Sequence, residues 1–209
     1  MEIREYHRLR EHERVYWWHV GKRALLSAIL RWGVRPDPQR PGLDVGCGAG
    51  GNFALLEPYG RFFGSEVSGE LYGRGRERPP RPVVLALGGA LPLADESLGI
   101  CTFFDVLEHV EDDDGFLQEI RRVLRPGGFV LVSVPAYQFL WSDHDVSLHH
   151  HRRYVRRTLT GSLKRNGYEV IRASYGFAGI LPAVAVVRWI TRLFPRRNGP
   201  TSSYVPTPR

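Results

Sequence analysis

The sequence predicts an α/β protein with a doubly wound, mainly parallel sheet. Short apolar runs alternate along the chain with stretches of helical periodicity, a pattern typical of parallel sheets whose two faces are covered by helices. A glycine-rich turn follows the first predicted strand, as in ligand-binding folds of this class. The 209 residues are 43% hydrophobic and 24% charged, which suits a globular chain with a full core and excludes a disordered or collagen-like one.

Residues 1–40 are predicted to form a helical leader. Leu25, Ile29 and Trp32 are spaced as one apolar face of a helix, and the stretch 36–42, rich in proline, ends it. The leader is highly charged and has no apolar segment followed by a small-residue cleavage site, so it is not a secretory signal and a cytoplasmic protein is expected.

The main predicted domain covers residues 41–175. A helix over 113–125 has acidic residues at its start and arginines at its end, which suits the helix dipole. An apolar C-terminal helix is expected over 176–194, and a loose tail over 195–209. Six apolar runs are predicted strands: 43–45, 61–66, 83–87, 99–104, 128–134 and 168–174.

The sequence LDVGCGAGG at 43–51 is the most informative stretch. Its glycines permit a tight turn and the close approach of a ligand to the backbone. Glu66 ends the next strand, where a carboxylate can accept hydrogen bonds from both ribose hydroxyls of an adenosine-containing cofactor. Asp44 would repel the pyrophosphate of a dinucleotide, whereas S-adenosylmethionine (SAM) carries a sulfonium and an ammonium group. We therefore favour SAM over NAD.

LDVGCGAGG, GSEVSG and the later stretch ALPLADESLGICTFFDVLEHVEDDDGFLQEIRRVLRPGGFVLVSVP resemble class I SAM-dependent methyltransferases. The similarity covers roughly residues 40–175 and is greatest to the branch that acts on small molecules, lipid-linked precursors and sugars. It implies a Rossmann-like methyltransferase fold, SAM as methyl donor and S-adenosylhomocysteine as product. The cofactor-binding residues that it implies are Asp44, Gly46, Cys47, Gly48, Gly50, Glu66, Val67, Gly88, Gly89, Asp105, Leu107 and His109.

The sequence departs from that family at the adenine-binding segment and at its C-terminal end. No acidic residue stands beside the adenine-binding segment, where Leu87, Gly88 and Gly89 offer only main-chain groups. Relatives end with an antiparallel hairpin that completes a seven-stranded sheet, whereas this chain has no convincing final strand. We therefore expect an incomplete C-terminal sheet edge, and an exposed edge would favour a homodimer.

His109 is the first candidate for a general base. It follows the fourth predicted strand, at the edge of the sheet where ligands bind, and imidazole titrates near neutral pH. The alternative is that His109 and Glu108 only order the loop.

The stretch WSDHDVSLHHHRRY at 141–154 allows three interpretations. A divalent metal could be bound by Asp143, His144, Asp145 and histidines of 149–151, but no tetrahedral ligand spacing is visible and no metal is predicted. His144 or His150 could act as a base while Arg152 or Arg153 holds an anionic substrate, or the whole stretch could be an ordered polar loop. His150, Arg153 and Tyr154 match the family resemblance. So do Trp17 and Trp18, either as a lid over the cofactor or as core tryptophans. The predicted catalytic residues are therefore His109, His144 and His150, and the predicted substrate contacts are Trp18, Arg153 and Tyr154.

The leading hypothesis is methyl transfer to an oxygen or nitrogen of a small or lipid-linked metabolite. An RNA methyltransferase is an alternative because the net charge is +7, but the chain leaves no room for a separate RNA-binding domain, so a nucleic-acid partner is not favoured. A non-catalytic SAM-binding regulator is the other alternative.

The C-terminal stretch 176–194 is a candidate for peripheral membrane contact, a dimer surface or a core helix. Pro182 and Arg188 interrupt its apolar run, which is too short to span a bilayer.

Overall fold

The computed structural model describes residues 17–67, 81–86 and 88–193. The chain divides into two compact units. The first comprises 1–107 with 112–133, and the second 108–111 with 134–209. The predicted tail at 195–209 and the first part of the predicted leader lie outside the described residues, as does Leu87.

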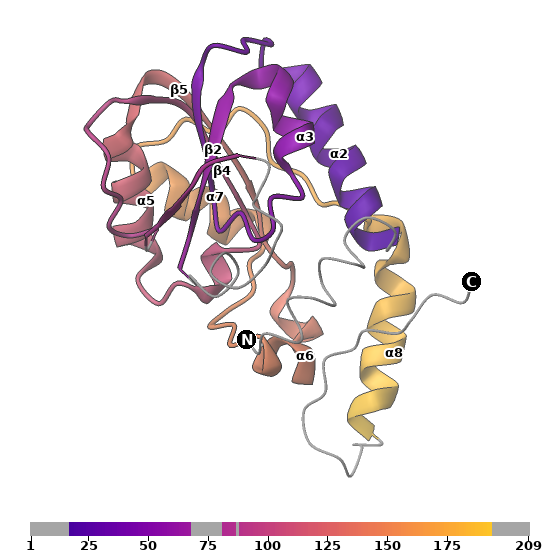
Figure 1. Cartoon of the computed structure of the whole chain (residues 1–209). Helices are drawn as coiled ribbons and strands as arrows, with labels where there is room; N and C mark the ends of the chain where they lie inside the picture. Colours follow the sequence, from indigo (N-terminus) through magenta and orange to yellow (C-terminus); the bar gives the residue numbers. More distant parts are fainter. Residues whose placement is uncertain (1–16, 68–80, 87, 194–209) are drawn as a thin grey trace. The chain divides into compact units, whose positions relative to one another are not determined.

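The first unit contains a five-stranded parallel sheet with the order β3-β2-β1-β4-β5. Figure 1 labels three of its strands, β2, β4 and β5. The chain builds one half outward from β1 and then returns to build the other half from β4. The neighbouring strands β1 and β4 therefore mark the topological switch point, where ligands bind in folds of this type. The predicted doubly wound, parallel architecture is confirmed. The strands are β1 Pro41–Val45, β2 Arg61–Glu66, β3 Val83–Leu85, β4 Leu98–Phe104 and β5 Leu124–Ser133.

Strand β4 lies in the interior of the sheet, and all seven of its residues are buried. Its side chains alternate between two covered faces. Ile100 and Phe104 belong to a core cluster on one face. Phe103 packs edge-to-face against Phe116 on the other, with ring centroids 5.2 Å apart. Helices therefore cover the sheet on both sides.

Helix α2, Trp17–Gly33, and helix α3, Phe53–Leu56, contribute to the Ile100 cluster. The predicted apolar face of α2 is wrong, because the buried side chains are Leu26 and Leu30 while Trp32 is 59% exposed. Trp17 and Trp18 begin the helix as expected, but both are exposed, so they are not core tryptophans. A short 3-10 helix, η1 Glu57–Tyr59, follows α3.

Helix α5, Asp113–Val123, covers the face that carries Phe103. The side chain of Asp112 caps its start by accepting the N–H of Gly115, because the first N–H groups of a helix have no partner within it. The helix ends two residues earlier than predicted, since Leu124 already pairs with Leu98 of β4. Two residues along β4 then correspond to five along β5, so the Pro-Gly-Gly segment of β5 bulges from the ladder.

The second unit is built of short helices. Among its described residues none belongs to a strand, so the predicted strand at 168–174 is wrong. Ile171 in that segment is 60% exposed, and β-branched residues form a strand only where a neighbouring strand pairs with them. The described sheet accordingly ends at β5, as expected for an incomplete C-terminal edge. The helices are η3 Gln138–Leu140, α6 Asp143–Ser147, α7 Arg156–Arg165, η4 Ala178–Ile180 and α8 Leu181–Leu193; η2 Leu107–His109 joins the two units.

Helix α8 corresponds to the predicted apolar C-terminal helix. Its large apolar residues Val187 and Trp189 are 59% and 64% exposed, so they are not core residues of this chain. Of the helices that the structure describes, none is both long enough and apolar enough to cross a membrane.

Candidate functional site

The glycine loop follows β1 at the switch point of the sheet. Its first two N–H groups, those of Gly46 and Cys47, donate to the carbonyl oxygen of Ser65 at 2.8 and 3.1 Å, which ties the loop to the end of β2. Gly46, Gly48 and Gly50 all have positive φ, a region that other residues rarely adopt. A Cβ on Gly46 would also lie 2.6 Å from a methyl group of Val106. Glycine is therefore required at this turn.

Glu66 lies beneath the loop, as its position at the end of β2 predicts. Its side chain is buried, with Oε2 accepting the Gly48 N–H at 3.1 Å and Oε1 accepting the Val67 N–H at 2.9 Å. Each carboxylate oxygen has two lone pairs, so both oxygens keep acceptor capacity for hydroxyl groups of a ligand. Val67 is exposed beside it.

Asp44 lies one strand away from Glu66, on β1. It is buried, and its Oδ1 accepts the hydroxyl of Thr102 on β4 at 2.6 Å. The two carboxylates thus belong to neighbouring strands, β1 and β2, on either side of the turn. Sequence reasoning missed Thr102, although a hydroxyl in an otherwise apolar central strand is a signal for a buried polar partner.

The remaining predicted cofactor residues differ in what their positions offer. The Cys47 side chain packs against Gly64 of β2 and Leu107 is fully buried, so both would meet a ligand only through the main chain. A Cβ on Gly88 would overlap the ring of Phe116, so packing under α5 requires this glycine. Gly89, in contrast, has nothing within 4 Å of the corresponding position.

Asp105 follows β4 with a φ of 55° and links three elements. Its carboxylate accepts the hydroxyl of Ser133 at the end of β5 at 3.0 Å and forms an ion pair with Lys22 of α2 at 2.5 Å. The leader helix is therefore attached to the carboxyl end of the sheet. Sequence reasoning missed the role of Lys22. The chain has only two lysines, and the presence of one of them in the leader was the available signal. One turn earlier, burial and the charge of Lys22 lower the pKa of His19 to about 4.

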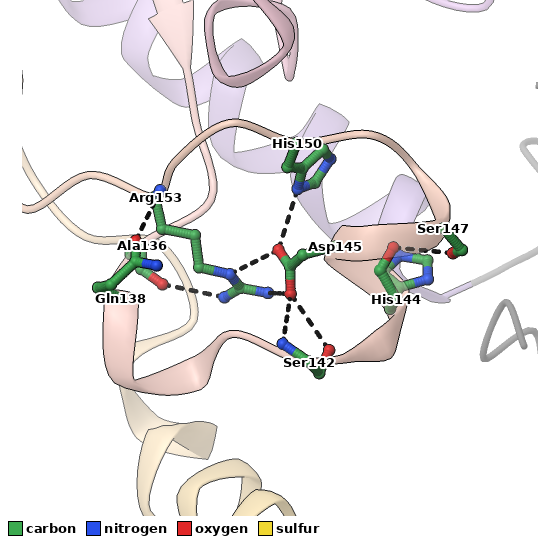
Figure 2. A network of polar contacts seen from close by, with 8 residues as sticks. All are labelled: Ala136, Gln138, Ser142, His144, Asp145, Ser147, His150 and Arg153. Carbon is green, nitrogen blue, oxygen red and sulfur yellow. Dashed lines mark hydrogen bonds and ion pairs between the residues drawn. The ribbon is translucent and has the colours of Figure 1, made fainter. Parts of the chain in front are cut away.

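In the second unit, Asp145 of α6 is the centre of a polar network (Figure 2). Its side chain is fully buried and accepts Arg153 Nε at 2.7 Å and Arg153 Nη2 at 2.9 Å. The N–H and hydroxyl of Ser142 donate to Oδ2 at 2.9 and 3.1 Å, and His150 Nδ1 lies 2.9 Å from Oδ1. Burial opposes ionisation, but the hydrogen bonds of His150 and Arg153 outweigh it and hold the pKa of Asp145 well below its usual range.

Arg153 and Tyr154 are integral to this unit. The Arg153 guanidinium is engaged by Asp145 and also donates to the carbonyl oxygen of Ala136 at 3.0 Å. Tyr154 is buried, and its backbone pairs with Ala136 and Tyr137. Both residues therefore have clear structural roles, as the ordered-loop interpretation expects.

Two of the three predicted catalytic histidines lie together. The rings of His109 and His150 are edge-to-face with centroids 4.6 Å apart, and Glu108 is fully buried beside them. One ligand atom from each of these three residues lies within 4.8 Å of the other two. His144 is not a member of that group, and burial lowers its pKa. Sequence reasoning missed Glu108 as a member, because the WSDHDVSLHHHRRY stretch begins 33 positions further along the chain.

The comparisons with known proteins agree with the geometry of the glycine loop. Residues 43–132 match the methyltransferase domain family. An uncharacterised 37.1 kDa protein of transposon TN4556 from Streptomyces fradiae is 37% identical over 139 residues, which are 61% of this chain and 40% of that protein. A protein of Mycolicibacterium smegmatis named as a probable S-adenosylmethionine-dependent methyltransferase is 35% identical over 61% of this chain and 51% of its own length. The chain thus spans about half the length of the curated relatives it matches.

Solved structures support the same fold. The YcgJ protein from Bacillus subtilis superposes with a TM-score of 0.62 at 17% identity, covering 84% of this chain and 86% of that one. A SAM-dependent methyltransferase from Aquifex aeolicus gives 0.55 at 18% identity, covering 70% and 81%. Residues 43–132 therefore match a methyltransferase domain, and the sheet that they form has the fold of SAM-dependent methyltransferases. SAM is the cofactor of that class.

Proposed function

We propose that the protein transfers the methyl group of SAM to an oxygen or nitrogen of a small or lipid-linked metabolite. The observation that carries this proposal is the pair of buried carboxylates, Asp44 and Glu66, on neighbouring strands around a glycine loop in left-handed conformation. Asp44 at this position disfavours a pyrophosphate and favours a ligand that carries cationic groups, while Glu66 can accept hydrogen bonds from ribose hydroxyls.

The glycine positions around the loop also leave room for a ligand. Nothing lies within 4 Å of the position that a Cβ would take on Gly48 or Gly89, so both leave space for a ligand against the main chain. Asp44 and the loop would hold the methionine part, Glu66 the ribose hydroxyls, and the main chain at Gly89 the adenine. SAM supplies an already activated methyl group, so the task of the protein is alignment and exclusion of water.

The leader helix supplies a candidate contact for the acceptor. Trp18 precedes Lys22 by one helical turn, so it lies on the face of α2 that reaches Asp105 at the end of β4. The exposed Trp18 would contact the acceptor, while Arg153 and Tyr154 would hold the histidine-rich segment in place. The exposed apolar residues of α8 favour a lipid-linked acceptor and a cytoplasmic protein at the membrane surface.

The acceptor's proton must also be removed during transfer to oxygen or nitrogen. The imidazoles of His109, His144 and His150 are the candidate groups, acting directly as a base or through a metal ion. Of these three, His109 and His150 lie next to each other, with their rings in edge-to-face contact.

Calorimetric titration with S-adenosylhomocysteine tests the cofactor site. We expect micromolar binding to the wild type and no binding of NADH. Glu66→Ala should weaken binding by about tenfold to several hundredfold, because hydrogen bonds to a charged group contribute roughly 1.5–3 kcal/mol each. Glu66→Gln keeps the shape of the side chain and should also weaken binding, through the loss of charge.

Glu57→Ala is the matched control, because Glu57 is an exposed carboxylate whose partner is Arg81. Its affinity should equal that of the wild type. Absence of S-adenosylhomocysteine binding to the wild type, or binding of NADH in its place, would overturn the proposal and make the glycine loop a dinucleotide site or a relic.

A further inference from the structure

Glu108, His109 and His150 form a group of potential metal ligands within the second unit. One nitrogen or oxygen atom from each lies within 4.8 Å of the others. In a tetrahedral metal site with bonds of roughly 2.0–2.2 Å, neighbouring ligand atoms are about 3.3–3.6 Å apart. Side-chain rotations that shorten the present separations would bring these three atoms to coordination distance.

The orientation of His150 is an independent indication of a metal ligand. Its Nδ1 faces Asp145 Oδ1 at 2.9 Å, and an ionised carboxylate can only accept, so Nδ1 is the donor of this bond and Nε2 is the nitrogen that a metal ion would take. Histidines that bind metals usually donate their other ring N–H to a carboxylate, which fixes the tautomer and raises the basicity of the ligand nitrogen. Asp145 is itself fixed by Arg153 and Ser142 (Figure 2).

The two chain segments that supply the group are joined by their backbones. The His151 N–H donates to the carbonyl oxygen of Glu108 at 2.7 Å, and Arg152 donates to the carbonyl oxygen of Glu111 at 2.6 Å. Both bonds connect 108–111 to the histidine-rich segment within one compact unit. The three side chains are thus held near one another before any ion binds, which lowers the entropy that binding must overcome.

We propose that Glu108, His109 and His150 bind one divalent transition-metal ion, with Asp145 as a positioning residue behind His150. Two imidazoles and one carboxylate suit Zn²⁺, Mn²⁺ or Fe²⁺ better than Mg²⁺ or Ca²⁺, which prefer oxygen ligands. Three protein ligands leave a coordination position open, as in catalytic rather than structural sites. The ion's role rests on the proposed function: the open position takes the acceptor's hydroxyl oxygen and makes that hydroxyl more acidic.

This site also differs from the ligand set that the sequence analysis weighed and did not favour. The earlier set combined Asp143, His144, Asp145 and the histidines at 149–151. Only His150 remains as a direct ligand, and Asp145 moves to the position behind it.

Metal binding is tested on the full chain after removal of metals with a chelator. Titration with zinc chloride alone should show one ion bound per chain with a micromolar or lower dissociation constant. His109→Ala and His150→Ala should each weaken binding at least tenfold, and Asp145→Asn by about 10–100-fold. Titration with Co²⁺ should give visible absorption bands, which both histidine variants lose.

His149→Ala is the matched control, since His149 is exposed, adjacent to His150 and outside the group. It should bind zinc as the wild type does. The metal proposal is overturned if the wild type binds no zinc, or if His109→Ala and His150→Ala bind it as tightly as His149→Ala. S-adenosylhomocysteine titrations on the same samples separate the two proposals, because loss of that binding with zinc binding intact refutes the cofactor site alone.

Discussion

Replacing Asp145 by asparagine should lower the free energy of unfolding by about 3–5 kcal/mol, the usual effect of removing one partner from a buried ion pair. The carboxylate is fully buried and accepts two guanidinium N–H groups, a backbone N–H and a hydroxyl, besides its contact with His150. An asparagine has one acceptor oxygen, and its NH₂ would face donors. The side chain of Arg153, only 11% exposed, would then lose its counter-charge.

The effect is large enough to measure by thermal unfolding followed by circular dichroism. In a chain of this size 1 kcal/mol corresponds to roughly 2–4 °C, so the midpoint should fall by about 6–20 °C. Asp143→Asn is the control, because Asp143 lies on the same helix but is exposed, and it should change stability by less than about 0.5 kcal/mol. If Asp145→Asn unfolds within about 1 kcal/mol of that control, the network is not a buried, paired charge and the reasoning fails.

Two further predictions concern the sheet-containing unit. Gly46→Ala should lower the free energy of unfolding by roughly 2–3 kcal/mol, because the φ of Gly46 is 64° and the Cβ of the alanine would lie 2.6 Å from Val106. Gly48→Ala should lower it by about 1 kcal/mol, because Gly48 also has a positive φ but its Cβ position is open. Equal losses for the two variants in urea titrations would contradict the steric argument. His19 has a pKa of about 4 when folded against 6.5 unfolded, so the unfolded chain binds more protons between these values and stability must fall as the pH drops through that range. After allowance for solvent screening of this partly exposed ring the loss is roughly 1–2 kcal/mol, and it should disappear in His19→Gln when unfolding is compared at about pH 7 and pH 4.5; the same slope in both proteins would refute it.

The parts of the fold that local sequence specifies could be predicted. Strand 99–104 is an almost continuous apolar run, and the glycine loop needs residues that accept positive φ, so each can be recognised from a few adjacent positions. Glu66 could be placed because the end of a strand fixes which edge of the sheet its side chain reaches.

Other features depend on contacts that no local pattern encodes. Leu25–Leu26 and Ile29–Leu30 define two overlapping apolar faces of α2, and only packing against the sheet selects Leu26 and Leu30. The run at 168–174 has the composition of a strand but no neighbour to pair with.

The polar partners of the candidate site residues also could not be predicted from local sequence patterns. Thr102 meets Asp44 across 58 residues, and Lys22 meets Asp105 across 83. Such partners are determined by the topology of the fold. The sequence therefore predicted the functional carboxylates but not their hydrogen-bond and ion-pair partners.

The ion pair between Lys22 and Asp105 also gives the protein a built-in chemical reporter. The chain has only two lysines, Lys22 and Lys164, so an amine-reactive reagent has two side-chain targets that a mass spectrometer can separate. Lys164 is exposed, while the side chain of Lys22 is 15% exposed and bound to a carboxylate. The labelling rate of Lys22 relative to Lys164 therefore reports how often the ion pair between Lys22 and Asp105 opens, and the measurement needs no mutation.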